Sequence, residues 1–257
     1  MAGLSGFPVV IKFNDEGYNV TFSGSVSVLT SIPNTGMVDF SLIQSACLSH
    51  SIEKTKDPVS FCENMVSEIY HGRGETVSSV AGMAVIRSQE GMIISAELAA
   101  SWKNYFHPRG NFSATFKGFT ACPCSMKSVR DLLQSEFPEY GSKISSLPGI
   151  THNQRVDFTV EMRYDKPLDH IIVQALKMAE FSMGNVLSFS DSQNETDLMI
   201  MKAHSNPRLI EDVLKKGVVY SRNLLKNIPE LTEMEIRVKS MESIHPYDAV
   251  ASATISR

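Results

Sequence analysis

The sequence predicts an α+β protein in which paired strands alternate with paired helices. Two runs rich in β-branched and aromatic residues are typical of strands, and the Asn-Asp-Glu-Gly segment between them predicts a hairpin turn. Asp57 precedes a proline and an apolar segment, as expected at a helix N-terminus. The expected elements of the first half are strands at 7–14, 18–30, 77–87 and 91–105, and helices at 39–47 and 58–70.

The second half repeats this order of elements, although no repeat is visible in the residues themselves. Residues 155–163 alternate between apolar and polar side chains, which is typical of a strand with one buried face. Asn206 is expected as a helix N-cap, with Pro207 at the first helical position. We therefore divide the chain into halves at 1–110 and 111–257, within one integrated domain. The remaining expected elements are strands at 111–120, 233–241 and 248–256, and helices at 125–137, 168–183 and 206–225.

The composition is that of an ordinary globular protein and argues against several classes of function. A net charge of −4 without Lys/Arg clusters argues against general nucleic-acid binding. No apolar stretch is long enough to span a membrane, and no signal-peptide pattern opens the chain. The four cysteines fit no secreted disulfide framework, so we expect a cytoplasmic protein with reduced thiols.

Cys122, Cys124 and His152 are the first candidates for chemistry. The two thiols flank Pro123, and His152 follows about thirty residues later among polar neighbours. A thiolate and an imidazole on separate elements could bind zinc or ferrous iron, or could form a nucleophile–base pair. Most free cysteines are small buried hydrophobic residues, and a histidine in a polar loop is often only a surface residue. The residues alone leave these alternatives open, including whether Cys124 is a ligand, a reserve thiol or a loop residue.

Two further candidate residues, His245 and Glu211, could each have a structural instead of a functional role. His245 lies in a turn between two expected strands, where a surface role is common. Glu211 lies in the first turns of an expected helix, where a carboxylate is stabilised by the helix dipole. By itself, each residue is compatible with a purely structural role.

Four motifs in a fixed order carry more information than their members. They are Ala-Cys-Pro-Cys-Ser, Thr-His-Asn-Gln-Arg, Ala-His-Ser-Asn-Pro-Arg-Leu-Ile-Glu-Asp and Glu-Ser-Ile-His-Pro-Tyr-Asp-Ala. Together they resemble the metal-dependent GTP cyclohydrolase family of type IB. The long connection between Cys122 and His152 is similar to the archaeal, methanopterin-pathway branch. The resemblance covers 118–250 well and the first hundred residues loosely.

This resemblance implies a tandem tunnelling fold, with two β-β-α-α-β-β units in each chain. Sheets of this fold close into a barrel on oligomerisation, so we expect a homodimer or homotetramer with active sites between subunits. The resemblance also implies roles for individual residues. The implied catalytic residues are Cys122 and His152, the implied metal ligands are Cys122, His152, His245 and Glu195, and the implied substrate contacts are Glu211, Gln154 and Arg155.

The reaction implied by the family begins with hydration of GTP at C8, releases formate and closes the ring again to a dihydropterin. The archaeal branch implies ferrous iron, with zinc or manganese as alternatives, and 7,8-dihydroneopterin 2′,3′-cyclic phosphate as the product. One alternative is the bacterial type, which yields the triphosphate for folate. Another is a tunnelling-fold protein that binds a pterin or purine without turning it over.

The chain departs from the family pattern at three places. Glu195 is displaced by about one position from the usual Asp-Glu pair, and Tyr247 stands where a second histidine is usual. No arginine follows Ser41, where the family has one that could hold phosphate. Another cation would have to replace it, and this leaves the product open. The candidate cations are Lys103, Lys117 and Arg109.

Overall fold

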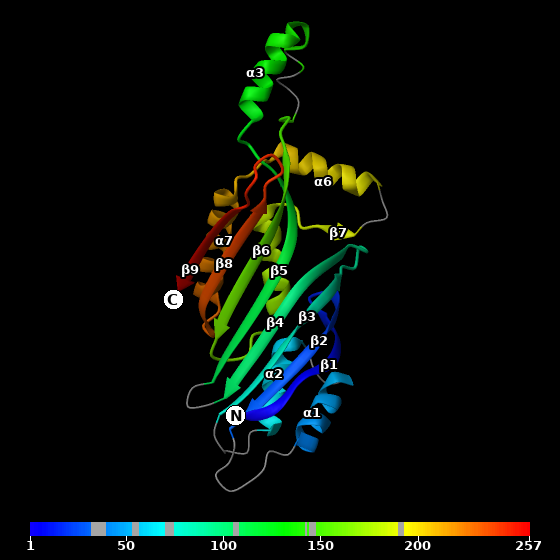
Figure 1. Cartoon of the computed structure of the whole chain (residues 1–257), viewed down its shortest axis with the longest axis vertical. Coiled ribbons are helices and arrows are strands. Elements are labelled where there is room, and N and C mark those ends of the chain that lie inside the picture. The colour runs from blue at the N-terminus through cyan, green and yellow to red at the C-terminus, as the bar shows by residue number, and fades with distance from the viewer. Residues whose placement is uncertain are drawn as a thin grey trace.

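A single antiparallel sheet organises the chain in the computed structural model, which describes residues 1–31, 40–52, 57–69, 75–104, 108–141, 143, 148–189 and 193–257. The sheet has nine strands in the order β1-β2-β3-β4-β5-β6-β8-β9, with β7 beside β4 (Figure 1). The strands are β1 (Ala2–Asp15), β2 (Tyr18–Thr30), β3 (Thr76–Arg87), β4 (Ile93–Asn104), β5 (Arg109–Ala121), β6 (Asn153–Tyr164), β7 (Ser188–Phe189), β8 (Leu231–Met241) and β9 (Ala249–Ser256). The described helices are α1 (Phe40–Ile52), α2 (Pro58–Ile69), α3 (Met126–Glu136), α5 (Ile171–Met183), α6 (Gln193–Ser205) and α7 (Ile210–Asn227), with a short 3₁₀ turn, η1 (Pro138–Tyr140).

The core lies between one face of the sheet and four helices. Helices α1 and α2 pack against β1 to β4, and helices α5 and α7 pack against β5, β6, β8 and β9 (Figure 1). Alternate strand residues point to the helices, so Phe22, Ile86, Phe116 and Phe158 are fully buried. Each such side chain contributes about 1.5–3 kcal/mol when it leaves water. The period-two pattern of the sequence therefore determines which face of the sheet is covered.

The predicted strands and most predicted helices are confirmed. The first half has the expected order of two strands, two helices and two strands. Asp57 caps α2 as predicted, because its Oδ1 accepts the N–H groups of Val59 and Ser60 at 2.7 and 2.8 Å. The sheet continues without a break from β4 to β5. The interpretation as two tunnelling units and the division into halves at residue 110 stay predictions, and the turn expected at 32–36 lies outside the described residues.

The predicted start of the last helix was wrong. Asn206 does not cap α7, since its N–H group bonds back to the carbonyl oxygen of Lys202 at 3.1 Å and ends α6, a helix that the sequence did not predict. Leu209 precedes α7 in an extended conformation and Asp212 accepts its N–H group. The residues between the two helices are fixed by other contacts, including a hydrogen bond from the Arg208 N–H group to the Ala121 carbonyl oxygen at 2.9 Å.

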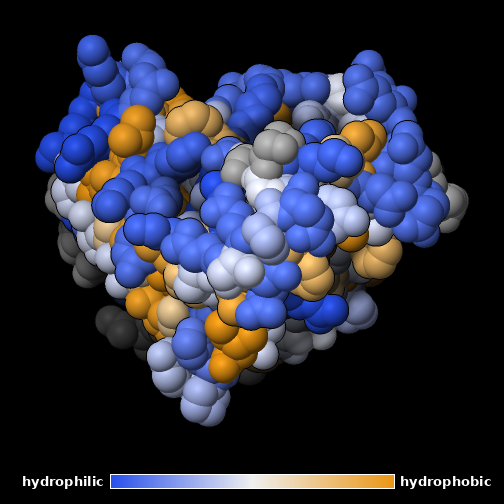
Figure 2. Space-filling view, turned by 90° about the horizontal axis from the view of Figure 1, so that it is seen from above, coloured by the Kyte–Doolittle hydropathy of each residue, from blue (hydrophilic) through white to orange (hydrophobic). Residues whose placement is uncertain are grey.

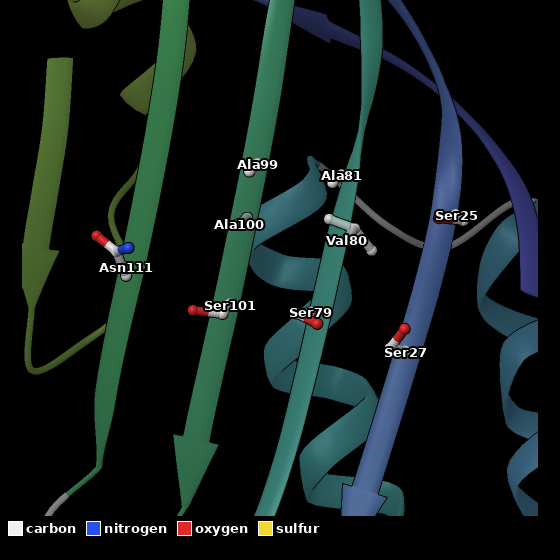
Figure 3. Close-up of a pocket in the computed structure, with 9 residues that line it drawn as sticks. All are labelled: Ser25, Ser27, Ser79, Val80, Ala81, Ala99, Ala100, Ser101 and Asn111. Atoms are coloured by element: carbon white, nitrogen blue, oxygen red, sulfur yellow. The ribbon is translucent and has the colours of Figure 1, made fainter. Parts of the chain in front are cut away.

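No helix covers the opposite face of the sheet in the described part of the chain. In the second half this face carries cross-strand ion pairs, such as Lys117–Asp157 at 3.4 Å and Arg163–Glu233. In the first half its side chains are mostly small, and they leave a shallow depression of about 290 Å³ (Figure 3). The depression is lined by Ser25, Ser27, Ser79, Val80, Ala81, Ala99, Ala100, Ser101 and Asn111. Among the described helices, none is both long and apolar enough to cross a membrane.

Two ion pairs connect the β1–β2 turn to α5. His170 Nδ1 lies 2.5 Å from Asp15 Oδ1, and Lys177 Nζ lies 2.5 Å from Glu16 Oε2. Glu16 (φ 44°) and His170 (φ 58°) are also the non-glycine residues with positive φ in the described chain. Such conformations cost energy and persist only when surrounding contacts hold them. The two pairs therefore attach the first hairpin to a helix of the second half.

We expect this contact to make stability depend on pH through His170. The hydrogen bond to Asp15 raises the pKa of His170, while Glu16 and Asp169 act in the same direction. A raised folded-state pKa means that the stabilisation is complete below the ordinary histidine pKa of about 6.5 and is lost as the pH rises through the folded value. His170→Asn retains a residue type that tolerates this backbone but cannot titrate.

The thermal midpoint should therefore differ more between the wild type and His170→Asn at about pH 5.5 than at about pH 9. The difference should be small because half of the imidazole is exposed and solvent screens the pair. A difference that is the same at both pH values would contradict a titrating contact.

Candidate metal centre

The pairing of β5 with β6 brings Cys122 beside His152. The ladder between these strands ends with the pair Ala121–Asn153. Ala121 immediately precedes Cys122, and Asn153 immediately follows His152. The Cys122 N–H group then donates to the His152 carbonyl oxygen at 3.1 Å. The Thr151 hydroxyl donates to the Cys122 carbonyl oxygen. Backbone contacts therefore fix both residues at one end of the sheet, close to the base of the projecting helix α3 (Figure 1).

Three ligand atoms converge at this point. The sulfur atoms of Cys122 and Cys124 and a ring nitrogen of His152 lie within 4.8 Å of one another. Cys124 Sγ lies 3.1 Å from His152 Nε2, and the Cys124 N–H group donates to Cys122 Sγ at 3.4 Å. Within the described residues no other group of three His, Cys, Asp or Glu side chains is as close. Cys122 is buried and Cys124 is exposed, so the cluster has an inner side and a solvent side.

Polar residues immediately after β8 lie beside the cluster. His152 Nδ1 lies 3.1 Å from Ser243 Oγ, which leaves Nε2 directed at the thiols. Glu242 accepts a hydrogen bond from the Ser240 hydroxyl at 2.9 Å. With its amide nitrogen turned to this carboxylate, buried Gln154 donates to both Glu242 oxygens at 2.9 and 3.0 Å. Sequence reasoning did not single out Ser243 and Glu242, although both stand in the motif that contains His245.

The electrostatics of the cluster favour a cation. Burial raises the pKa of the Cys122 thiol to about 11, and the nearby Cys124 thiol and Glu242 carboxylate contribute to the rise. A bound divalent ion reverses this effect, because its charge stabilises the thiolate. Sulfur and imidazole ligands suit zinc and ferrous iron, and the contact of Ser243 with the far ring nitrogen can orient His152 as a ligand. The residues therefore fit a metal ion.

The other predicted site residues lie outside this group. The His245 ring centroid is 6.3 Å from that of His152, and His245 stacks on Tyr247, the residue that stands in place of a second histidine. Glu195, in the first turn of α6, lines a separate cavity of about 400 Å³ with Glu180 and other residues. Their roles as metal ligands stay predictions.

The predicted substrate residues differ in exposure. Glu211 is exposed in the first turn of α7, and Arg155 is exposed on β6. Gln154 is buried beneath Glu242. Seen from the α3 end, the surface is mostly hydrophilic with separate apolar patches (Figure 2). A polar ligand would therefore meet a largely polar surface at this end.

The sheet, its covering helices and the sulfur–imidazole cluster define an α+β protein with a candidate metal centre at one end of the sheet. The chain belongs to the type I GTP cyclohydrolase folE2 family, whose model matches residues 78–251. This match confirms the resemblance carried by the four motifs, since it includes the thiols and His152.

Curated relatives point to the same family. The chain is 30% identical over 144 residues to the GTP cyclohydrolase MptA of Thermoplasma acidophilum, over 56% of this chain and 49% of that protein. It is 27% identical over 180 residues to the GTP cyclohydrolase MptA of Methanosarcina acetivorans, over 65% of this chain and 56% of that protein. The matched region therefore spans about half the length of these relatives.

Solved structures show where else the fold occurs. The uricase from Arthrobacter globiformis superposes with a TM-score of 0.53 at 11% identity, over 100% of this chain and 93% of that chain. A hyper-thermostable AgUricase mutant superposes with a TM-score of 0.54 at 10% identity, over 100% of this chain and 91% of that chain. Similarity at this level of identity shows a shared fold and nothing about chemistry.

We expect Cys122→Ala to abolish tight metal binding while the chain still folds. Removing a ligating sulfur should weaken affinity at least about 100-fold, because even an indirect contact to a metal ligand is worth 10- to 100-fold. Cobalt(II) titration, followed by the sulfur-to-cobalt absorption band, measures binding, and far-ultraviolet circular dichroism checks the fold. Cys47→Ala, a thiol buried at α1, is the matched control. Full metal occupancy in Cys122→Ala would show that the site is elsewhere.

Proposed function

We propose that this chain is a metal-dependent GTP cyclohydrolase of the archaeal type. The observation that carries the proposal is the convergence of Cys122, Cys124 and His152 at the end of β5 and β6 in a member of this family. The named activity of the MptA relatives supports GTP as the substrate. The proposed reaction hydrates C8 of GTP, releases formate and gives 7,8-dihydroneopterin 2′,3′-cyclic phosphate.

Ferrous iron is the metal we propose, with zinc as the alternative that the ligands favour next. Manganese fits less well, because it prefers oxygen ligands to sulfur. Cys122, Cys124 and His152 would hold the ion, and His245 and Glu195 are proposed to complete the site when subunits assemble. A divalent ion of this kind supplies Lewis acidity that activates water near neutral pH.

The residues of the chain would orient the substrate and handle its protons. Glu211 presents two carboxylate oxygens that can accept the adjacent N–H donors of the guanine ring. Ser243 keeps His152 Nε2 turned to the cluster. Glu242, held by Ser240 and Gln154, contributes to the raised pKa of Cys122, and His152 is the residue that we propose to transfer protons.

Arg155 is the cation that we propose for the triphosphate. It is exposed on β6, three residues beyond His152. The earlier candidates are less suitable: Lys103 is paired with Glu75 and Lys117 with Asp157. Arg109 is the first residue of β5, whereas Cys122 follows the last residue of that strand. At about 3.3 Å per residue, the strand places Arg109 roughly 40 Å from Cys122.

Assembly into a homodimer or homotetramer would complete the proposed site. Strands β1 and β9 are the two edges of the described sheet, and each is paired on one side only. Unpaired edges of this length are places where another chain can add to a sheet. We propose that they close a tunnelling-fold barrel with the active site between subunits, in a cytoplasmic protein whose four cysteines are free.

The direct test is anaerobic incubation of the purified protein with GTP and ferrous iron. We expect formate and, by mass spectrometry, a dihydroneopterin cyclic phosphate. Formate with a triphosphate product would assign the chain to the bacterial type. The absence of formate with ferrous, zinc and manganese ions would contradict catalysis. It would instead favour a protein that binds a purine or pterin, as the missing arginine after Ser41 suggests.

Glu211→Gln should lower kcat/KM for GTP by about 10- to 150-fold, because hydrogen bonds to a charged group contribute about 1.5–3 kcal/mol. The amide can accept only at its single oxygen, so one guanine donor loses its partner. Glu139→Gln, at an exposed carboxylate in η1, is the control and should match the wild type. A wild-type kcat/KM in Glu211→Gln would remove this residue from the substrate site.

A further inference from the structure

Arg208 is a buried cation at the end of a helix. Its side chain is 8% exposed, and its NH1 group donates to the carbonyl oxygens of Phe181, at 3.1 Å, and Ser182. These carbonyls belong to the last turn of α5, where helix N–H groups no longer reach them. The negative end of the helix dipole also lies here, so a guanidinium both caps α5 and balances its charge.

The backbone of Arg208 reaches the thiol segment. Its N–H group donates to the carbonyl oxygen of Ala121 at 2.9 Å, and Ala121 is the residue immediately before Cys122. The chain after α5 is attached to β5 as well, since Phe119 N donates to Asn185 O at 3.1 Å and Leu187 N donates to Lys117 O at 2.8 Å. Arg208 therefore connects the last turn of α5, through its side chain, to the end of β5, through its backbone, next to the cluster.

The same residue lies immediately before the N-cap of α7. Leu209 follows it in an extended conformation, and α7 starts at Ile210 with Glu211 in its first turn. Burial lowers the pKa of Arg208, and the nearby carboxylate of Asp212 opposes the change. Asp212 also accepts the Leu209 N–H group at 3.3 Å. The position of Glu211 thus depends on contacts that begin at Arg208.

The chain leaves space for a planar guanidinium at this point. Gly184, the residue that ends α5, has φ 83°, and a Cβ atom there would lie 3.1 Å from the guanidinium carbon. A glycine without a side chain therefore lets Arg208 approach the last turn of α5. An arginine can place several donors in one plane, which the single ammonium of lysine cannot reproduce.

We propose that Arg208 is a positioning residue that fixes the distance between the thiol cluster and Glu211. It acts through Ala121 on one side and through the start of α7 on the other, and it touches neither metal nor substrate. The catalytic consequence rests on the proposed function, whereas the effect on the geometry of the cluster does not. A shift of about 1 Å between the metal and the guanine anchor would be enough to reduce turnover by about 100-fold.

The test compares Arg208→Met and Arg208→Lys with Arg222→Met, which removes an exposed arginine from α7, the helix that follows Arg208. All variants are studied well below their thermal midpoints. We expect Arg208→Met to change the absorption spectrum of the cobalt(II)-loaded protein and to lower kcat by tenfold or more. We expect KM for GTP to change less than kcat. Arg208→Lys should recover part of both properties, and Arg222→Met should match the wild type in each.

A lower thermal midpoint alone, with an unchanged cobalt spectrum and unchanged kcat, would show that Arg208 only stabilises the fold and would overturn the proposal. If Arg208→Met does not fold, the spectrum and kcat of Arg208→Lys decide by the same criteria. If the wild type releases no formate, the proposed function fails by itself. The cobalt spectrum and equilibrium binding of GTP then test whether Arg208 holds the cluster and Glu211 in place.

Discussion

The antiparallel ladder between β5 and β6 is the constraint on which the candidate site depends. It runs in register from the pair Gly110–Tyr164 to the pair Ala121–Asn153 and continues as the hydrogen bond between Cys122 and His152. The connection between the two strands carries α3, a helix without buried residues, so the sheet and not the connection determines how the two residues meet. Pairing registers are strongly specified when one face of a strand is buried, as it is here. A slip of β6 by one residue would turn Phe158 to solvent and shift the imidazole relative to the thiols.

Local chemistry explains how far the sequence predicted the fold. The alternation in β6, the cap at Asp57 and the two-residue turn at Glu16–Gly17 are each specified by a few neighbouring residues, and each was predicted correctly. The missed helix α6 has little amphipathic pattern, and only Ala203 is buried in it. The start of α7 was misplaced because Asn206 and Pro207 have the composition of a helix N-terminus, whereas the neighbouring Arg208 N–H group bonds to Ala121. Contacts between residues so distant in sequence cannot be inferred from local preference.

The same distinction applies to the site. Cys122 and His152 could be singled out because their residue types have a restricted chemistry, and the structure places them together. Serine and glutamate are common surface residues, so the sequence did not mark Ser243 and Glu242 as site residues. Their contacts with His152 and Gln154 depend on the pairing of β8 with β6. Glu195 and Glu211 are a different case, because they lie on α6 and α7 and outside the cluster. Their proposed roles therefore rest on the family to which the chain belongs and not on contacts with the cluster.

The asymmetry of the two thiols bears on how such a centre could work. Cys122 is buried, and its backbone is held by hydrogen bonds with the His152 carbonyl oxygen and the Thr151 hydroxyl. Cys124 and His152 are closer to solvent, and their side chains meet at 3.1 Å. Burial raises the pKa of the Cys122 thiol, so binding of a metal ion there would be coupled to deprotonation. A centre closed on its inner side and open on its outer side keeps a position for water or substrate, which distinguishes a catalytic metal site from a structural one.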